Sequence, residues 1–136
     1  ARMHIDGGCH CGYVTYAAEI DPERVSICHC SDCQMLTGSA YRVTVTARRA
    51  DFRLLSNAPK LYAKTGDSGR TSLQFFCPEC GSPVYRCSDA PDDPEIGIRL
   101  GGIRQRRELR PRRQIWCRSA LSWVDEIAEL PRSSQE

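Results

Sequence analysis

Nine cysteines in a chain of 136 residues constrain this fold more than any other feature of the sequence. Their number is odd and they are clustered, whereas disulfide-bonded scaffolds are usually smaller, secreted and even in cysteine count. Metal ligation therefore explains the clusters better than disulfides do. A chain of this length usually forms one domain with one hydrophobic core, so we expect the metal sites within a single folded unit.

The first predicted metal site combines two cysteine pairs that are far apart in the chain. Residues 77–81 read Cys-Pro-Glu-Cys-Gly, a knuckle in which two sulfurs share one tight turn and the glycine accepts a positive φ. A knuckle of this kind supplies Cys77 and Cys80, two of the four ligands of a tetrahedral zinc site. We expect Cys9 and Cys11 to supply the others, because side chains two apart on a strand face the same side. We call this closed, structural arrangement the four-cysteine site.

The second cluster, which we call the three-cysteine site, consists of Cys28, Cys30 and Cys33. The first two share a strand face. Cys33 can join them if Ser31–Leu36 forms a short helix, for which Ser31 or Asp32 would be the N-terminal cap. Three ligands leave a fourth position open, as in catalytic rather than structural zinc sites. Three thiolates also leave a bound zinc with net negative charge, which suits it to accept a substrate sulfur rather than to generate hydroxide.

Other interpretations of the cysteines remain open from the sequence. The three-cysteine site would be closed if Cys87 or Cys117 added a fourth thiolate, although both are more typical of ordinary buried thiols. Either C-x-x-C pair could be a redox dithiol, but the βαβ context of a thioredoxin is missing. Iron also occupies four-thiolate sites, and zinc is favoured for paired knuckles. His10 and His29 lie between ligating cysteines, so we expect them to point away from the metal into solvent.

The rest of the sequence predicts short strands separated by turns rich in Gly, Pro, Asp and Asn. No repeated βαβ pattern occurs, which argues against a doubly wound nucleotide-binding fold. The expected architecture is mainly antiparallel β, organised around metal. The nine predicted strands cover residues 13–18, 25–28, 40–46, 52–56, 61–64, 73–77, 84–87, 96–100 and 114–117.

Charge and hydropathy argue against two classes of protein, and the distribution of charge marks one unusual segment. A net charge of +2 argues against a globally basic nucleic-acid-binding protein, and no apolar run approaches the ~18 residues of a membrane span. Residues 99–118 nevertheless carry eight arginines against one acid. Guanidinium groups bind carboxylates and phosphates through paired donors. We expect substrate binding by Arg106, Arg107, Arg112 and Arg113; the alternatives are a solvated loop and a nucleic-acid surface.

Four motifs stand in the order and spacing of one known family. They are Gly-Gly-Cys-His-Cys-Gly-Tyr-Val-Thr-Tyr at residues 7–16, Cys-His-Cys-Ser-Asp-Cys at 28–33, Thr-Gly-Ser at 37–39 and Phe-Cys-Pro-Glu-Cys-Gly-Ser-Pro at 76–83. Together they resemble the glutathione-dependent formaldehyde-activating enzymes, also called the CENP-V/GFA domain. The resemblance extends over residues 3–123, nearly the whole chain.

The resemblance implies a mainly β, Mss4-like β-tent of antiparallel sheets around zinc, as one domain at residues 3–130 with a polar tail at 131–136. It implies two zinc ions per chain, structural at the four-cysteine site and catalytic at the three-cysteine site. The implied activity is that of a carbon–sulfur lyase, which joins formaldehyde to glutathione or a similar acidic thiol as an S-hydroxymethyl adduct. The alternative is a non-catalytic zinc scaffold that binds a partner, as other Mss4-like folds do.

Two positions differ from this family and bear on the substrate more than on the metal sites. A Gly-x-Leu-Asp-Asp-like stretch of the family reads Gly-Gly-Ile-Arg-Gln at residues 101–105, so an acidic turn has become basic. Gln114 stands where members often carry a histidine. No signal-peptide pattern precedes the first cysteine, and we expect a cytoplasmic enzyme without membrane attachment.

Overall fold

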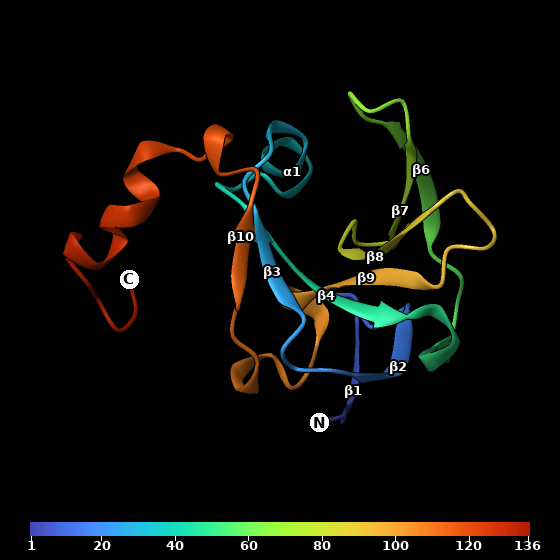
Figure 1. Cartoon of the computed structure of the whole chain (residues 1–136). Coiled ribbons are helices and arrows are strands. Elements are labelled where there is room, and N and C mark those ends of the chain that lie inside the picture. The colour runs from blue at the N-terminus through green and yellow to red at the C-terminus, as the bar shows by residue number, and fades with distance from the viewer.

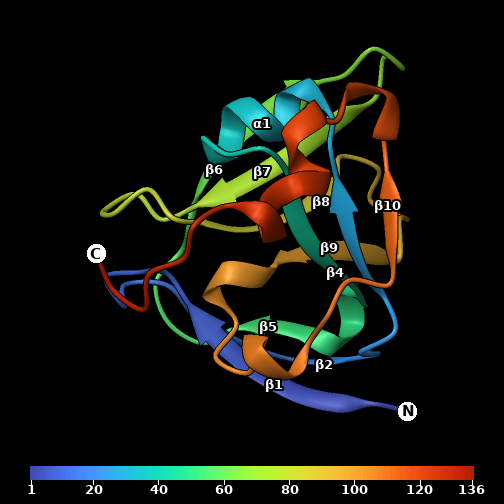
Figure 2. The same cartoon turned by 90° about the vertical axis from the view of Figure 1, so that its left-hand side faces the viewer.

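Two β-sheets form the framework of the protein in a computed structural model that describes residues 1–136 (Figures 1 and 2). The smaller sheet has the order β1-β2-β5 and the larger one the order β10-β3-β4-β9-β8-β7-β6. Every pairing is antiparallel except that of β10 with β3, which is parallel. The strands are β1 (Met3–Gly8), β2 (Thr15–Ile20), β3 (Val25–Cys28), β4 (Arg42–Arg48), β5 (Phe52–Leu54), β6 (Lys60–Thr65), β7 (Thr71–Phe76), β8 (Pro83–Ser88), β9 (Glu95–Arg99) and β10 (Arg113–Ile115).

Helical structure is limited to short segments. The single α-helix, α1 (Ser31–Thr37), follows β3 and ends at Gly38, whose φ of 66° gives the left-handed turn common after helices. The 3₁₀ turns are Arg49–Asp51, Leu100–Gly102, Arg106–Glu108, Cys117–Ser119 and the longer Ser122–Glu129, which stands away from the sheets in Figure 1. None of these helices is long and apolar enough to cross a membrane.

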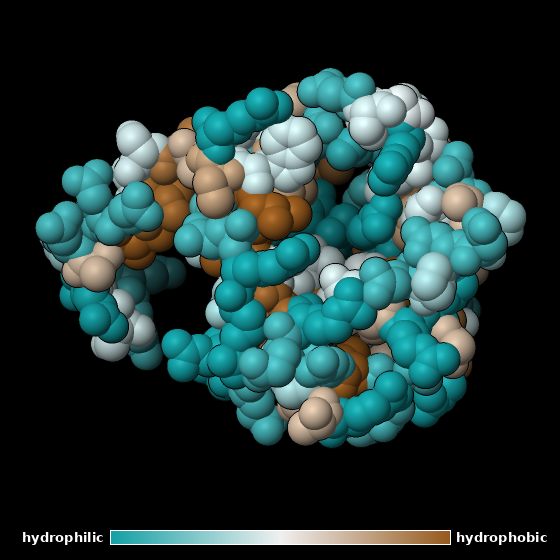
Figure 3. Space-filling model, in the orientation of Figure 1, coloured by the Kyte–Doolittle hydropathy of each residue, from teal (hydrophilic) through white to brown (hydrophobic).

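The hydrophobic core joins the two sheets. Ile5 of β1 and Tyr16 of β2 are buried in the same cluster as Val45 of β4 and Ile98 of β9. The strands β2 and β9 each have three consecutive buried residues, so both faces of these strands are covered. The space around α1 and the β6–β7 hairpin lies outside this core. Figure 3 shows a hollow there, bordered by hydrophilic side chains.

The mainly β, antiparallel class expected from the sequence is confirmed, and each of the nine predicted strands is present within two residues at either end. The sequence analysis missed β1, because Asp6, Gly7 and Gly8 look like a turn. The glycines serve close backbone contact instead. A Cβ on Gly7 would lie 2.1 Å from the carbonyl oxygen of Gly102, so only glycine fits where β1 meets this 3₁₀ turn.

Candidate functional site

The four-cysteine site joins the turn after β1 to the turn between β7 and β8, which are far apart in the sequence. The sulfur atoms of Cys9, Cys11, Cys77 and Cys80 all lie within 4.8 Å of one another. Cys11 Sγ is 3.6 Å from Cys9 Sγ and 3.7 Å from Cys77 Sγ. Sulfurs bound tetrahedrally at ~2.3 Å from a zinc ion lie about 3.8 Å apart, so the donor set and its spacing fit zinc.

The first of these turns differs from the expected geometry. Cys9 and Cys11 are not on a strand but in the turn after β1, so the strand-face argument for their convergence was wrong. The Gly12 amide donates to the carbonyl oxygen of Cys9 at 3.2 Å, with a φ of 85° at Gly12. The Val14 amide donates to Cys9 Sγ at 3.2 Å. The turn itself therefore directs both sulfurs to one side.

The second turn repeats this arrangement. The Gly81 amide donates to the carbonyl oxygen of Cys77 at 2.9 Å, with a φ of 81° at Gly81. The amides of Glu79 and Cys80 donate to Cys77 Sγ. Hydrogen bonds from the side chain and the backbone of Ser82 lower the pKa of the Cys80 thiol to about 5. Such bonds favour the thiolate, which is the form that binds metal.

The three-cysteine site lies where β3 meets α1. The sulfurs of Cys28, Cys30 and Cys33 also lie within 4.8 Å of one another. The cap of α1 is Cys30, whose Sγ accepts from the Cys33 amide at 3.3 Å, and not Ser31 or Asp32 as expected. A thiolate sulfur accepts hydrogen bonds, so it can fill the role that Ser or Asp fills at other helix starts.

The site has three thiols and no fourth in the structure. Cys87 is 5% exposed and lies in the hydrophobic core, and Cys117 is exposed on the 3₁₀ turn after β10. Neither belongs to the group of converging sulfurs. A hydrogen bond with Cys28 is the main cause that lowers the pKa of the Cys33 thiol to about 5, and the guanidinium of Arg42 adds to it.

Arg42 is the feature of this site that the sequence analysis missed. It opens β4, pairs with Cys28 in the sheet register and is only 5% exposed. Its Nε and Nη2 atoms are buried without a hydrogen-bond partner. A buried cation is stable only near compensating negative charge. The Cys33 thiolate, whose pKa Arg42 helps to lower, supplies that charge, so Arg42 offsets negative charge at the three-cysteine site.

His29 and Gln114 form a hydrogen bond that links the cysteine-bearing turn of the same site to β10. His29 is 1% exposed, which corrects the expectation that it faces solvent. Its Nε2 lies 2.8 Å from Oε1 of Gln114 on β10, the residue that stands where the family often has histidine. The Gln34 side chain donates to the carbonyl oxygens of His29 and Ser119. The turn that carries the cysteines is thereby fixed to the C-terminal part of the chain. His10, in contrast, is exposed as expected.

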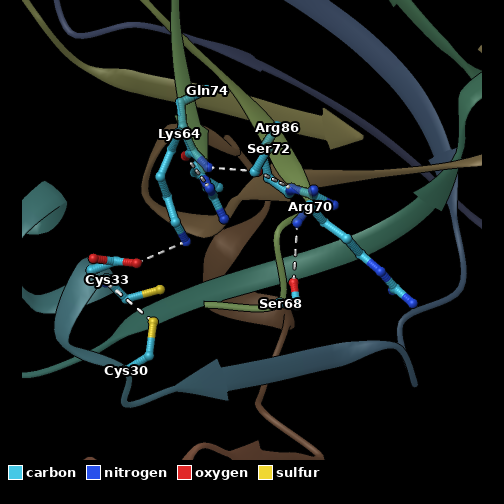
Figure 4. Close-up of polar contacts among 10 residues, drawn as sticks. Cys30, Cys33, Lys64, Ser68, Arg70, Ser72, Gln74 and Arg86 are labelled. Carbon is cyan, nitrogen blue, oxygen red and sulfur yellow. Dashed lines mark hydrogen bonds and ion pairs between the residues drawn. The ribbon is translucent and has the colours of Figure 1, made fainter. Parts of the chain in front are cut away.

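A cleft of about 610 Å³ opens beside Cys30 (Figure 4). Lys64, Arg70 and Arg86 reach it from the β6–β8 side, opposite Cys30 and Cys33, as the close-up shows. Lys64 Nζ lies 3.1 Å from a carboxylate oxygen of Asp32, and Arg86 Nε donates to Ser72 Oγ at 3.1 Å. The cleft therefore offers cations beside Cys30, and three carboxylates, those of Asp32, Asp67 and Asp93, line it as well.

Trp116 borders the same cleft in an unusual conformation. It is the one non-glycine residue with positive φ, at 56°, which is rare for an aromatic residue. The guanidinium of Arg118 lies 5.0 Å from the centre of its ring. The predicted strand at 114–117 stops at Ile115 because Trp116 turns the chain sharply. Strained residues of this kind gather at functional sites.

The four arginines expected to bind substrate do not converge. Arg106 lines a separate cleft, and Arg107 is exposed and forms no ion pair. Arg112 forms an ion pair with Glu23 at 3.0 Å, and Arg113 lies beside a shallow pocket next to the same glutamate. Apart from Arg118, the cations of the cleft beside Cys30 lie outside the arginine-rich segment and come from positions 64, 70 and 86.

Comparisons with known proteins agree with this geometry. Residues 4–119 match the glutathione-dependent formaldehyde-activating enzymes. A crystal structure of a Rhodobacter sphaeroides protein has the same fold, with a TM-score of 0.62 and 24% identity over 80% of this chain and 98% of the other. No curated protein matches the sequence. Because the matched region contains both cysteine sites and most of both sheets, the chain belongs to the family of glutathione-dependent formaldehyde-activating enzymes.

Proposed function

We propose that the protein is a zinc-dependent carbon–sulfur lyase that acts on the adduct of an acidic thiol with an aldehyde, and that formaldehyde and glutathione are its model substrates. The observation that carries this proposal is the cleft beside Cys30, whose lining includes four cationic side chains, next to three converging thiols that leave a fourth ligand position open. Family membership adds independent support. We place the reaction in the cytoplasm, where glutathione is abundant and thiols stay reduced.

Both cysteine sites are proposed to hold zinc, and their roles differ. The four-cysteine site has no free ligand position and would act in stability alone. At the three-cysteine site a zinc ion would supply a Lewis-acidic position that favours the deprotonated form of a substrate sulfur. Cys28, Cys30 and Cys33 would hold it there. Arg42 would balance the excess negative charge of three thiolates from within the sheet.

The other residues of the cleft bind and orient the substrate in this proposal. The guanidinium groups of Arg70, Arg86 and Arg118 suit the two carboxylates of a glutathione-like peptide. Lys64 is held by Asp32 and closes the cleft between β6 and α1. Holding the substrate at its charged ends fixes the distance of its sulfur from the three thiols. Such positioning can account for much of an enzymatic rate enhancement.

The reaction itself balances without a further reagent. The carbon–sulfur bond forms between the thiol sulfur and the carbonyl carbon of formaldehyde. The electron pair of the carbon–oxygen π bond moves to the oxygen, and the proton of the thiol ends on that oxygen. The reverse reaction returns each of these to its starting position, so neither direction needs an oxidant or a reductant.

A direct test follows formaldehyde consumption by NMR with glutathione and the zinc-loaded protein. We expect the adduct to form faster than without enzyme. No acceleration with metal content confirmed would reject the proposed reaction and favour the alternative of a non-catalytic zinc scaffold.

The cleft residues give a more specific prediction. Arg70→Gln and Arg118→Gln should each raise the KM for glutathione by about three- to tenfold, since each removes one charged hydrogen-bond donor to a carboxylate. Steady-state kinetics at saturating formaldehyde would measure this, with kcat little changed. Arg112→Gln is the matched control, because it removes one arginine that lies outside the cleft and pairs with Glu23. An equal change of KM in the control would contradict the proposed substrate position.

Arg42 gives a prediction about metal rather than substrate. Arg42→Gln should weaken zinc binding at the three-cysteine site by about 10- to 100-fold, as loss of groups next to metal ligands commonly does. Competition with a chromophoric chelator would measure it, and the four-cysteine site serves as the internal reference for unchanged affinity. Arg42→Lys keeps the charge and should have a smaller effect. Equal zinc affinity in the wild type and Arg42→Gln would show that Arg42 has no such role.

A further inference from the structure

A second cleft, of about 720 Å³, is lined by four arginines and by no acidic residue. We call it the arginine cleft; its charged lining residues are Arg42, Arg99, Arg104 and Arg106. Its walls also include Gly7 and Gly8 of β1, His10 and Ser82 next to the four-cysteine site, and Tyr41. It does not include Cys28, Cys30 or Cys33, and it shares no lining residue with the cleft beside Cys30.

The arginines of this cleft have guanidinium N–H donors that form no hydrogen bond within the protein. Arg104 uses Nε on the carboxylate of Asp6, and Arg106 uses one nitrogen on the carbonyl oxygen of Ile103 at 3.3 Å. Each guanidinium carries five N–H donors, so most remain free. Arg42 has two buried nitrogens without a partner and Arg99 has one. Asp6 is the one carboxylate paired with these four arginines, so the cleft keeps an excess of positive charge that favours binding of an anion.

Hydrogen bonds to β1 hold the backbone at Arg104 in place. The Arg104 amide donates to the carbonyl oxygen of Asp6 at 2.8 Å, and the Gln105 side chain donates to the Asp6 carboxylate at 2.7 Å. The hydrogen bonds from Gln105 and Arg104 hold the pKa of the Asp6 carboxyl below its usual range. The backbone of the basic turn at 101–105 is thus fixed on β1, so that Arg104 starts from a defined position when a ligand binds.

We propose that the arginine cleft is a binding site for a small ligand that carries a multiply charged oxyanion, such as a phosphoryl group or closely spaced carboxylates. Guanidinium groups bind both through paired hydrogen bonds. The concave shape and the buried Arg42 favour a small molecule over a nucleic acid, which would also contact the arginines outside the cleft, at 107, 110, 112 and 113. The proposal concerns binding alone and is independent of the reaction proposed above.

Calorimetric titration of the zinc-loaded protein with inorganic phosphate, and separately with tricarballylate, tests the site at constant ionic strength. We expect saturable binding of at least one of them with one site per chain, and the stronger of the two identifies phosphoryl or carboxylate chemistry. The double variant Arg104→Gln/Arg106→Gln should weaken that binding by about tenfold or more. Arg112→Gln/Arg113→Gln is the matched control, with the same loss of charge from the same segment, and should stay within about twofold of the wild type.

Several results would overturn the proposal. One is the absence of saturable binding of either anion; another is an equal loss of affinity in the two double variants, which would indicate diffuse attraction to the whole arginine segment. A third is tighter binding of a single-stranded oligonucleotide that depends on Arg112 and Arg113, which would identify a nucleic-acid surface. Circular dichroism of both double variants verifies the fold. Anion binding can fail while adduct formation persists, so the two proposals are distinguishable.

Discussion

Replacing Cys77 by serine should abolish the cooperative thermal unfolding of the native protein. Its sulfur is buried, accepts hydrogen bonds from the amides of Glu79 and Cys80, and lies 3.7 Å from Cys11 Sγ. Zinc binding contributes ~10–16 kcal/mol to the folding of zinc-finger peptides, whereas a whole domain is stable by only ~5–15 kcal/mol. Loss of one ligand therefore removes a share of stability that the core cannot replace.

Thermal scans by circular dichroism, with zinc measured by mass spectrometry, would record the effect. Cys117→Ser is the matched control, because this thiol is exposed and belongs to neither cluster; it should unfold like the wild type with the same zinc content. Prolonged treatment of the wild type with a strong chelator should reproduce the effect of Cys77→Ser. A native-like melting transition in Cys77→Ser would mean that the core is stable without the four-cysteine site.

Replacing Cys33 by serine should, in contrast to Cys77→Ser, abolish activity and leave the fold intact. This residue lies in α1, outside the main core, and it contributes one of only three thiols to its site. We expect turnover of the glutathione adduct to fall by more than about 100-fold, since removal of a direct ligand exceeds the effects seen for its neighbours. The zinc content should fall from near two to near one per chain.

Two measurements separate this result from general damage. The melting temperature of Cys33→Ser should stay much closer to that of the wild type than that of Cys77→Ser does. The chelator affinity of the remaining zinc should match that of the four-cysteine site in the wild type. A Cys33 variant that unfolds as readily as the Cys77 variant would identify the site as structural and would favour the scaffold interpretation.

The local signals in the sequence were sufficient for most of the fold. Val25–Cys28 is a strand in both the sequence analysis and the structure, because its apolar residues and the following cysteines leave few alternatives. The strand β1 was missed for a physical reason. Its glycines allow the close approach of Gly102, a contact nearly a hundred residues away in the chain that no local pattern contains.

For the candidate site, too, the sequence predicted some features and not others. Cysteine spacing indicated which sulfurs would converge, since a C-x-x-C turn brings its own pair together. The geometry was less predictable: Cys30 caps α1, and Cys9 lies in a turn stabilised by the Val14 amide. Arg42 looked like any polar residue at the start of a strand. Its burial opposite Cys28 follows from the pairing of β3 with β4, which only the assembled sheet determines.

The parallel pairing of β10 with β3 has a consequence for how the protein is made. Proteins are synthesised from the N-terminus, so every ligand of both cysteine sites leaves the ribosome before β10 does. The residues that support the three-cysteine site come later in the chain. Gln114 forms a hydrogen bond with His29, and the Ser119 carbonyl oxygen accepts one from Gln34. A nascent chain can therefore bring the cysteines of both sites together before the segment that supports the three-cysteine site has been made, and this support is complete only when synthesis has passed residue 119.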